Sequence, residues 1–252
     1  MCLIGLAWQQ DPEIPLLVLA NRDEFHERPT KSLHRWSDYS HIVAGRDLRG
    51  GGTWMGITDQ GRIAMLTNFR EAQIDSQDRP SRGELVTDFL LSSETPEHWV
   101  ESLAQRAHHY AGFNLIVGGL DTGLIYCSNR ANTQRLKPGY YALSNGVLSD
   151  QWPKTRGLAN DLADTHKPWR DDAVLLRLLE NMSQPTDDEL PETGVGLSEE
   201  RRLATRMIIS SDYGTRASTL LRARSSHMTI TEYTRDPQGQ IISSAEEAVV
   251  TT

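Results

Sequence analysis

The second residue of the chain, Cys2, is the side chain whose position could do the most distinctive chemistry. If the initiator Met1 is removed, one residue carries both a thiol nucleophile and a free α-amine. The amine titrates near ~8, so much of it is neutral at cellular pH and can accept the thiol proton. A small buried cysteine at the start of an edge strand is the alternative interpretation, and residue type alone favours it. The nucleophile hypothesis therefore depends on what lies beside Cys2.

The tetrad Asn21-Arg22-Asp23-Glu24 is the second group that could act on a thiol. If the apolar runs before it form an antiparallel hairpin, this tetrad lies next to Cys2. Arg22 would then lower the pKa of the thiol and orient it, and a carboxylate such as Asp23 could hold the α-amine. A charged strand end in water is the alternative, and it holds if Cys2 is elsewhere.

Asn68 and Asn145 each follow an apolar run that is typical of a strand. Amide donors at strand ends can stabilise a developing oxyanion. The alternative is that both are turn residues, which the Asn145-Gly146 pair favours for Asn145. We expect both side chains to point into the pocket that holds the Cys2 sulfur.

The elements that must position these residues are strands and helices in separate blocks. Two apolar runs across a short polar turn, Cys2 to Trp8 and Pro15 to Ala20, predict a hairpin. Thr95 followed by Pro96 predicts the start of a helix. Further strands are predicted over 54–57, 62–67, 113–118, 123–127, 139–143, 207–210, 217–223 and 228–233, and further helices over 81–91, 153–165 and 171–182. Hairpins imply antiparallel sheets, and grouped helices imply layers, so we expect an α+β fold with two antiparallel sheets between helical layers.

Length, charge and cysteine content exclude several classes of protein. The chain has 252 residues, and we expect one domain over residues 1–252. Its net charge of −8 argues against a general affinity for nucleic acid. Two cysteines make no disulfide framework, the first residues resemble no signal peptide, and no apolar run reaches the length of a membrane span. We therefore expect a soluble cytoplasmic protein. No spacing of histidines or cysteines resembles a metal site.

Arginine dominates the basic residues of the chain. Only four of its 26 basic residues are lysine: Lys31, Lys137, Lys154 and Lys167. Arginine is the better ligand for carboxylates and phosphates, but a GC-rich coding bias is the favoured explanation.

A series of short motifs, taken together, resembles the NRDE family, also called the transport and Golgi organization family. The motifs are Met1-Cys2-Leu3-Ile4, Asn21 to Phe25, Arg28-Pro29-Thr30, Gly45-Arg46-Asp47, Gly51 to Gly56, Leu66 to Arg70, Ser81 to Leu85, Phe113-Asn114-Leu115, Leu143 to Gly146 and Tyr213 to Arg216. Each motif alone is weak, but their order extends over most of the chain.

The resemblance implies an αββα sandwich of the N-terminal-nucleophile hydrolases, close to the branch with bile-salt hydrolases and penicillin V acylases. That branch uses a terminal cysteine, an arginine and an aspartate on the neighbouring strand, two asparagines near the oxyanion and a late arginine. By resemblance these positions are Cys2, Arg22, Asp23, Asn68, Asn145 and Arg216. The order Asn-Arg-Asp-Glu departs from the acylase pattern, so either Asn21 or Arg22 could face the thiol.

The resemblance also implies a second role, because family members are linked to haem mobilisation and to lipid and secretory-pathway homeostasis. The chain has no haem-attachment motif, so haem would be a reversibly bound ligand. Candidate axial ligands are Cys2, Cys127, His26 and His34, and arginines could meet the propionates.

Two functions from different classes follow. The first is an N-terminal-cysteine hydrolase that cleaves the C–N or thioester bond of a small acylated molecule and needs no cofactor. The second is a non-catalytic carrier of haem or a related amphipathic ligand. An apolar pocket lined by tryptophans would serve either.

Overall fold

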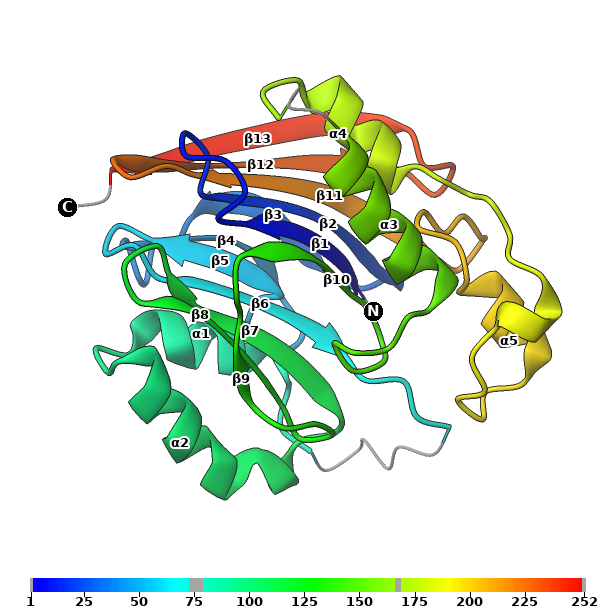
Figure 1. The fold of residues 1–252 in the computed structure, drawn as a ribbon, viewed down its shortest axis with the longest axis horizontal. Coiled ribbons are helices and arrows are strands. Elements are labelled where there is room, and N and C mark those ends of the chain that lie inside the picture. Colours follow the sequence, from blue (N-terminus) through cyan, green and yellow to red (C-terminus); the bar gives the residue numbers. More distant parts are fainter. Residues whose placement is uncertain (1, 73–78, 166–168, 251–252) are drawn as a thin grey trace.

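The computed structural model describes residues 2–72, 79–165 and 169–250 of the chain. Two antiparallel sheets lie face to face, with helices on the outer side of each (Figure 1). The first sheet has six strands in the order β10 (Gly139–Leu143), β1 (Cys2–Trp8), β2 (Leu16–Phe25), β11 (Tyr213–Ala223), β12 (His227–Arg235) and β13 (Ile241–Val250).

The second sheet has seven strands. Its strands are β3 (Thr30–Arg35), β4 (Ile42–Asp47), β5 (Met55–Thr58), β6 (Ile63–Asn68), β7 (Phe113–Gly119), β8 (Gly123–Ser128) and β9 (Gln134–Arg135). The helices are α1 (Gly83–Leu91), α2 (Pro96–Arg106), α3 (Pro153–Asp164), α4 (Asp172–Leu179) and α5 (Leu197–Arg202), with short 3₁₀ turns at Ala107–His109 and Asp187–Glu189. Helices α1 and α2 contact the seven-stranded sheet, and α3 and α4 contact the six-stranded sheet (Figure 1). The expected αββα sandwich is confirmed.

Strand β1 shows why a continuous apolar run forms a strand here. Ile4 and Leu6 face the core between the two sheets, whereas Leu3 and Ala7 face the core under α3 and α4. Because successive side chains of a strand point to opposite faces, a strand buried on both sides has no polar alternation. This alternation also decides which neighbours of Cys2 share its face.

Several predicted elements are confirmed, and several others differ from the prediction. Thr95 caps α2 as expected, accepting a hydrogen bond from the backbone N–H of His98 at 3.3 Å. The strand predicted over 207–210 is wrong, because that segment is irregular, while β3, β4, β9, β13 and α5 were not predicted. The tetrad does not follow a strand but lies inside β2, which continues to Phe25. Polar residues continue this strand because β11 supplies backbone partners for it as far as Phe25.

Among the described residues, no helix combines the length and apolar character needed to cross a membrane.

Candidate active site

The register of the β1–β2 pair places Cys2 directly opposite Arg22. Opposed residues of an antiparallel pair share a face of the sheet, so the thiol and the guanidinium both point toward the space between the two sheets. Asn21 is opposite Leu3 and points the other way. Its amide donates to the carbonyls of Leu179 and Arg206, at 3.1 and 2.9 Å. Of the two candidates for the residue facing the thiol, the structure therefore selects Arg22.

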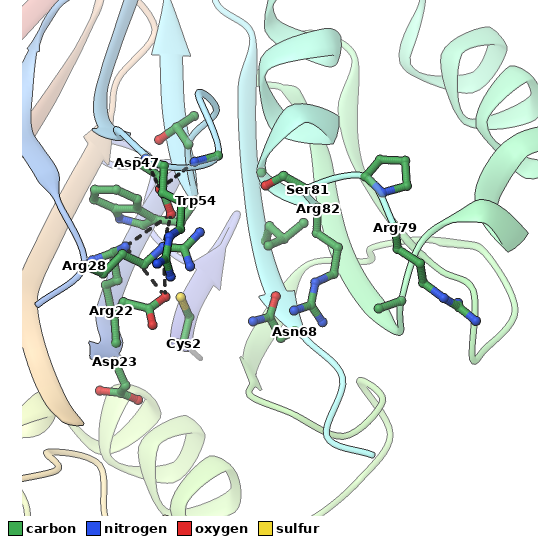
Figure 2. A pocket seen from close by; sticks show the side chains of 18 residues that line it. Cys2, Arg22, Asp23, Arg28, Asp47, Trp54, Asn68, Arg79, Ser81 and Arg82 are labelled. Carbon is green, nitrogen blue, oxygen red and sulfur yellow. Dashed lines mark hydrogen bonds and ion pairs between the residues drawn. The ribbon is translucent and has the colours of Figure 1, made fainter. Parts of the chain in front are cut away.

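A cavity of about 600 Å³ opens beside the Cys2 sulfur (Figure 2). Its lining residues come from β1 and β2, the loops after β2 and β4, the end of β6, the start of α1 and Ala111. They are Cys2, Arg22, Asp23, Glu24, Arg28, Asp47, Arg49, Gly50, Thr53, Trp54, Leu66, Asn68, Arg79, Pro80, Ser81, Arg82, Gly83 and Ala111. The lining is mostly charged and polar and holds one tryptophan, which differs from the apolar pocket expected above.

Arg22 is held firmly on the wall that carries Cys2. Its side chain is 5% exposed, and its guanidinium lies 4.4 Å from the centre of the Trp54 ring. Its Nη2 lies 3.6 Å from Asp47 and 3.8 Å from Glu24. The Nη1 atom is buried and has no hydrogen-bond partner among the described residues. A buried donor without a partner is costly, so this atom is suited to receive a ligand oxygen.

The opposite wall carries Asn68, Ser81 and Arg82, and Figure 2 shows their side chains across the opening from Cys2. This wall lies close to the loop after β4 because Gly52 of that loop and Gly83 of α1 are in contact at its base. The N–H of Thr53 donates to the Gly83 carbonyl at 3.2 Å. A Cβ on Gly52 would lie only 2.4 Å from the Gly83 carbonyl carbon, so no larger residue fits there without displacing α1.

Burial raises the pKa of the Cys2 thiol above its usual value. The positive charge of Arg22 acts in the opposite direction, and Asp23 adds to the increase. Arg22 lowers the pKa of the thiol, as expected, but burial is the largest effect and raises that pKa by more, so the net shift is upward. At neutral pH the thiol keeps its proton, and attack requires a base.

Asp23 is 1% exposed and lies on the same face of β2 as Asn21, yet at this strand end it still lines the cavity. Its Oδ1 accepts a hydrogen bond from Thr215 Oγ1 at 2.6 Å. Burial raises the pKa of the Asp23 carboxyl, and the charge of buried Lys154 opposes that shift. Figure 2 shows Asp23 pointing away from Arg22. Arg22 and Asp23 therefore lie on different sides of Cys2.

Asn68 and Asn145 are close to each other, but only Asn68 lines the cavity. The Asn68 side-chain amide has no hydrogen-bond partner among the described residues. Asn145 is buried, and its Nδ2 donates to the Asn68 carbonyl at 2.7 Å. Its Oδ1 accepts from Ser144 Oγ, which also contacts the Cys2 carbonyl at 3.1 Å. Asn145 therefore positions the chain around Asn68 and Cys2, which differs from the expectation that both amides face the sulfur.

Arg216 lies outside the cavity lining, beside a bulge in β11. Its guanidinium donates to the carbonyls of Phe25 and Arg28, at 3.3 and 2.5 Å. These contacts hold the turn after β2, and this turn carries Arg28 into the cavity. Arg216 therefore stabilises the turn that carries Arg28 and does not itself line the cavity.

The candidate haem ligands are not gathered in one place. Of the four, only Cys2 lines the cavity. Cys127 is buried in the core between the seven-stranded sheet and its helices. His26 bonds through Nε2 to the Ser210 carbonyl at 2.9 Å, and His34 bonds through Nδ1 to the Ser32 carbonyl at 2.7 Å.

Comparison with known proteins assigns the family. The family model described as Transport and Golgi organisation 2 matches residues 1–237. A Transport and Golgi organization protein 2 homolog from Homo sapiens is 31% identical, and the alignment covers 92% of each chain. The chain belongs to the Transport and Golgi organisation 2 family. The resemblance inferred from the motifs is confirmed, and a Mus musculus member is 29% identical over the same shares.

A solved structure shares the fold of this family member. It is the Caenorhabditis elegans ortholog of N-acylethanolamine-hydrolyzing acid amidase, with a TM-score of 0.55 and 13% identity. The match covers 88% of this chain and 92% of that one. At this identity the likeness shows the fold alone, which is that of the N-terminal-nucleophile hydrolases.

Several lining residues of this family member have types and spacings that predicted no role for them. Among them are Arg28, Asp47, Trp54, Arg79 and Arg82. Most lie within motifs that carried the resemblance, but their charges and spacing showed no chemistry of their own. Asp47, for example, accepts hydrogen bonds from the backbone N–H groups of Arg49 and Gly50 and from Arg28 Nε, and so orders the glycine-rich loop.

Labelling should distinguish the two thiols. We expect iodoacetamide to modify Cys2 well before Cys127 in the folded protein, as read by peptide mapping. Cys2 lines the cavity, whereas burial raises the pKa of Cys127 to about 12 and no cavity reaches it among those described. Labelling in denaturant, where the two rates should converge, is the control. Preferential modification of Cys127 in the folded state would contradict this assignment of the site.

Proposed function

We propose that this protein is an N-terminal-cysteine hydrolase that cleaves the C–N or thioester bond of a small acylated molecule. The observation that carries the proposal is the joint placement of the Cys2 thiol, the Arg22 guanidinium and the Asn68 amide on one cavity. The Asn68 amide lines the cavity and has no described hydrogen-bond partner, and Arg22 keeps one N–H group without a partner, so each offers a donor for a substrate carbonyl oxygen. The fold, shared with an amidase, is compatible with this chemistry.

The proposed reaction runs in two steps. The Cys2 sulfur attacks the carbonyl carbon, its proton passes to a base, and the base returns that proton to the departing nitrogen or sulfur as the bond breaks. Water then attacks the resulting thioester and releases the carboxylic acid and the free thiol. The second step returns the thiol to its starting state, so no external reductant or oxidant is consumed.

The base in this proposal is the α-amine that Cys2 gains when Met1 is removed. A neutral amine can accept the thiol proton, and the raised pKa of the thiol makes such a base necessary. The buried Asp23 carboxyl, fixed by Thr215, is placed to hold the amine in position. A reduced thiol is also required, which fits the cytoplasm that we propose as the location.

Asn68→Ala tests the proposed oxyanion donor. The amide lines the cavity and has no other described partner, so its loss removes a donor without breaking a contact of the fold. We expect turnover to fall about 10²–10³-fold with little change in the melting temperature. Steady-state kinetics and thermal unfolding of the same preparation provide both readouts. A wild-type rate in the variant would remove Asn68 from the mechanism.

The proposal is tested by intact mass and a substrate panel. Intact mass shows whether Cys2 is the first residue of the purified protein. The panel pairs N-acyl amides and acyl thioesters of several chain lengths, and hydrolysis of at least one of them is expected. A protein that keeps Met1 and hydrolyses none of them would contradict the hydrolase.

A haem carrier is the second candidate, favoured by the cavity thiol and by arginines that could meet propionates. The larger apolar residues of the lining, which could contact the faces of the macrocycle, are Trp54, Leu66, Pro80 and Ala111. Haem titration discriminates the candidates. A saturable Soret shift that is lost in Cys2→Ala, without turnover on the panel, would favour the carrier.

A further inference from the structure

We infer that Arg79 and Arg82, together with the start of α1, form an anion-binding subsite on the cavity wall opposite Cys2, and that the acylated substrate carries an anionic group there. The inference builds on the proposed function by naming a substrate class for the same cavity. The anion would be a carboxylate, a sulfonate or a phosphate, which share the oxygen geometry that guanidinium groups bind.

The cavity is cationic although the chain is acidic. Five arginines line it against three carboxylates, so the lining carries a formal charge of +2 while the whole chain carries −8. The five cations are Arg22, Arg28, Arg49, Arg79 and Arg82, and the three anions are Asp23, Glu24 and Asp47. A cationic cleft in an acidic molecule attracts anionic ligands into the cleft specifically.

The charges on the Cys2 wall are largely neutralised by each other. Arg28 Nε lies 2.7 Å from Asp47 and 3.7 Å from Glu24. Arg22 shares the same two carboxylates at longer distances. These four residues form a balanced cluster, so the excess positive charge lies elsewhere in the cavity.

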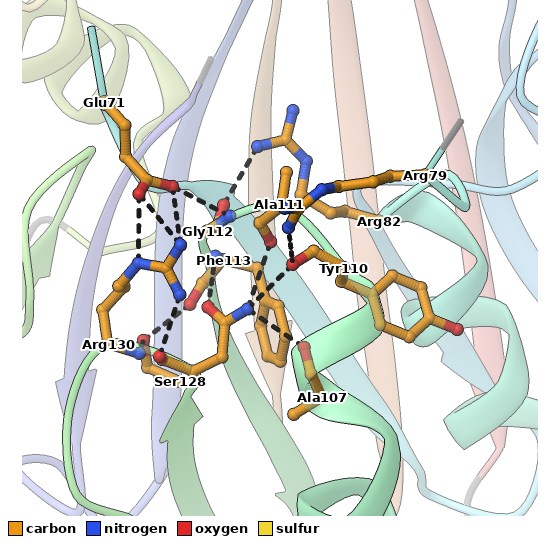
Figure 3. Close-up of polar contacts among 11 residues, drawn as sticks. Glu71, Arg79, Arg82, Ala107, Tyr110, Ala111, Gly112, Phe113, Ser128 and Arg130 are labelled. Carbon is orange, nitrogen blue, oxygen red and sulfur yellow. Dashed lines mark hydrogen bonds and ion pairs between the residues drawn. The ribbon is translucent and has the colours of Figure 1, made fainter. Parts of the chain in front are cut away.

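Three cations remain against one carboxylate, Asp23: Arg49 is exposed on the loop after β4, and Arg79 and Arg82 lie on the opposite wall. Arg79 and Arg82 each donate to a backbone carbonyl, Tyr110 at 3.0 Å and Gly112 at 2.9 Å (Figure 3). Neither has an ion pair with a carboxylate among the described residues. A carbonyl fixes the direction of a guanidinium without cancelling its charge, and each group keeps further N–H donors for a ligand.

The carboxylate that acts most strongly on Arg82 is already occupied. Glu71 makes a two-oxygen ion pair with Arg130, with contacts of 2.9 to 3.2 Å, and accepts from the Gly112 N–H at 3.1 Å (Figure 3). Asn129 adds bonds to the carbonyls of Tyr110 and Ala111, at 3.2 and 3.3 Å. The backbone of Tyr110, Ala111 and Gly112, whose carbonyls accept from both arginines at Tyr110 and Gly112, is thus itself held by Glu71 and Asn129.

Two further observations point to a ligand in this cavity. Helix α1 begins at Gly83, which lines the cavity, so the positive end of the helix faces the same space. The buried Nη1 of Arg22 has no described partner and lies on the other side of the opening. Burial lowers the pKa of the Arg82 guanidinium, and the negative charges of Glu71 and Glu24 oppose that shift.

Alkylation of Cys2 by a matched pair of reagents tests the subsite without any assay of turnover. The pair is N-iodoacetylglycine, which carries a carboxylate, and N-iodoacetylglycinamide, which is neutral. We expect the ratio of anionic to neutral rate to be about tenfold higher in the folded protein than in urea, and to fall as salt is added. Longer N-iodoacetyl amino acids extend the series and locate the cation by the chain length of maximum rate.

Variants assign the effect to a residue. Arg82→Gln and Arg79→Gln should each lower the ratio severalfold, and Arg82→Lys, which keeps the charge, should retain most of it. Arg135→Gln is the matched control because Arg135 is exposed and pairs with Glu97 outside the cavity, so its ratio should equal that of the wild type. Thermal unfolding shows whether each variant is folded.

The result that overturns the subsite is a folded-state ratio equal to the ratio in urea, or a ratio insensitive to both glutamine variants. Slowing of the anionic reagent by inorganic phosphate but not by acetate would assign the subsite to phosphate-bearing substrates, and the reverse to carboxylates. The experiment measures alkylation of Cys2 and not hydrolysis. Its result therefore tests the anion subsite separately from the proposed hydrolase activity.

Discussion

Cys2→Ser should lower turnover on any hydrolysed member of the acyl panel by at least about 10³-fold while leaving the fold intact. A hydroxyl keeps nearly the same volume at this buried strand end but is a much weaker nucleophile than the thiol that it replaces. The side chain is 8% exposed and touches a cavity, so the change opens no void in the core. Steady-state kinetics and circular dichroism on the same samples measure both effects.

Cys127→Ala is the matched control for that experiment. It removes the other cysteine of the chain from a core that does not line the cavity. We expect some loss of stability and no loss of turnover per folded molecule. If Cys2→Ser keeps wild-type turnover, the reaction does not run through Cys2 and the proposed function is wrong.

Glu200→Ala should destabilise the fold by about 3–5 kcal/mol, the largest effect on stability that we expect of a single substitution here. Glu200 pairs with Arg70 at 2.5 Å, and both side chains are 4% exposed. Its other oxygen accepts from the N–H and hydroxyl of Thr193. Removing the carboxylate leaves the Arg70 charge buried and uncompensated. Urea unfolding followed by tryptophan fluorescence gives the free-energy difference.

Two further variants separate the ion pair from simple packing. Glu97→Ala breaks an ion pair with Arg135 whose side chains are 44% and 55% exposed, so its cost should stay within about 1 kcal/mol. The double variant Arg70→Met with Glu200→Leu should recover much of the stability lost in Glu200→Ala, because no lone charge remains. If Glu200→Ala and the double variant lose the same free energy of unfolding, the uncompensated Arg70 charge is not the cause of the loss.

The Arg70–Glu200 pair matters to the site because it joins α5 to the chain just after Asn68. The backbone N–H of Arg70 donates to the Asn145 carbonyl at 2.7 Å, and Asn145 in turn holds the Asn68 carbonyl. Residues that sequence reasoning assigned to an oxyanion hole are thus linked to a helix that it did not predict. The pair was invisible in the sequence because its members are 130 positions apart.

Periodicity and short-range signals were sufficient for the layers of the fold. The apolar runs around the first turn, the Thr95-Pro96 cap and the stripes of the later helices each depend on neighbours within a few residues. Strand β13 was not predicted because most of it is exposed and it lacks an apolar pattern. The family motifs then placed Cys2, Arg22 and Asp23 together at one strand end, as the register shows.

The αββα architecture, the family and the residue types at the end of β1 all follow from the amino-acid sequence. The face that each side chain takes follows from the folded sheet instead, because it depends on register, and a shift of one residue would exchange Arg22 for Asn21. The tertiary structure also decided that burial outweighs Arg22 at the thiol and that Asn145 and Arg216 support the site from outside the cavity. The placement of Arg79 and Arg82 on one wall of the cavity likewise depends on the folded structure. Solvation and charge balance depend on neighbours that the chain brings together only when it is folded.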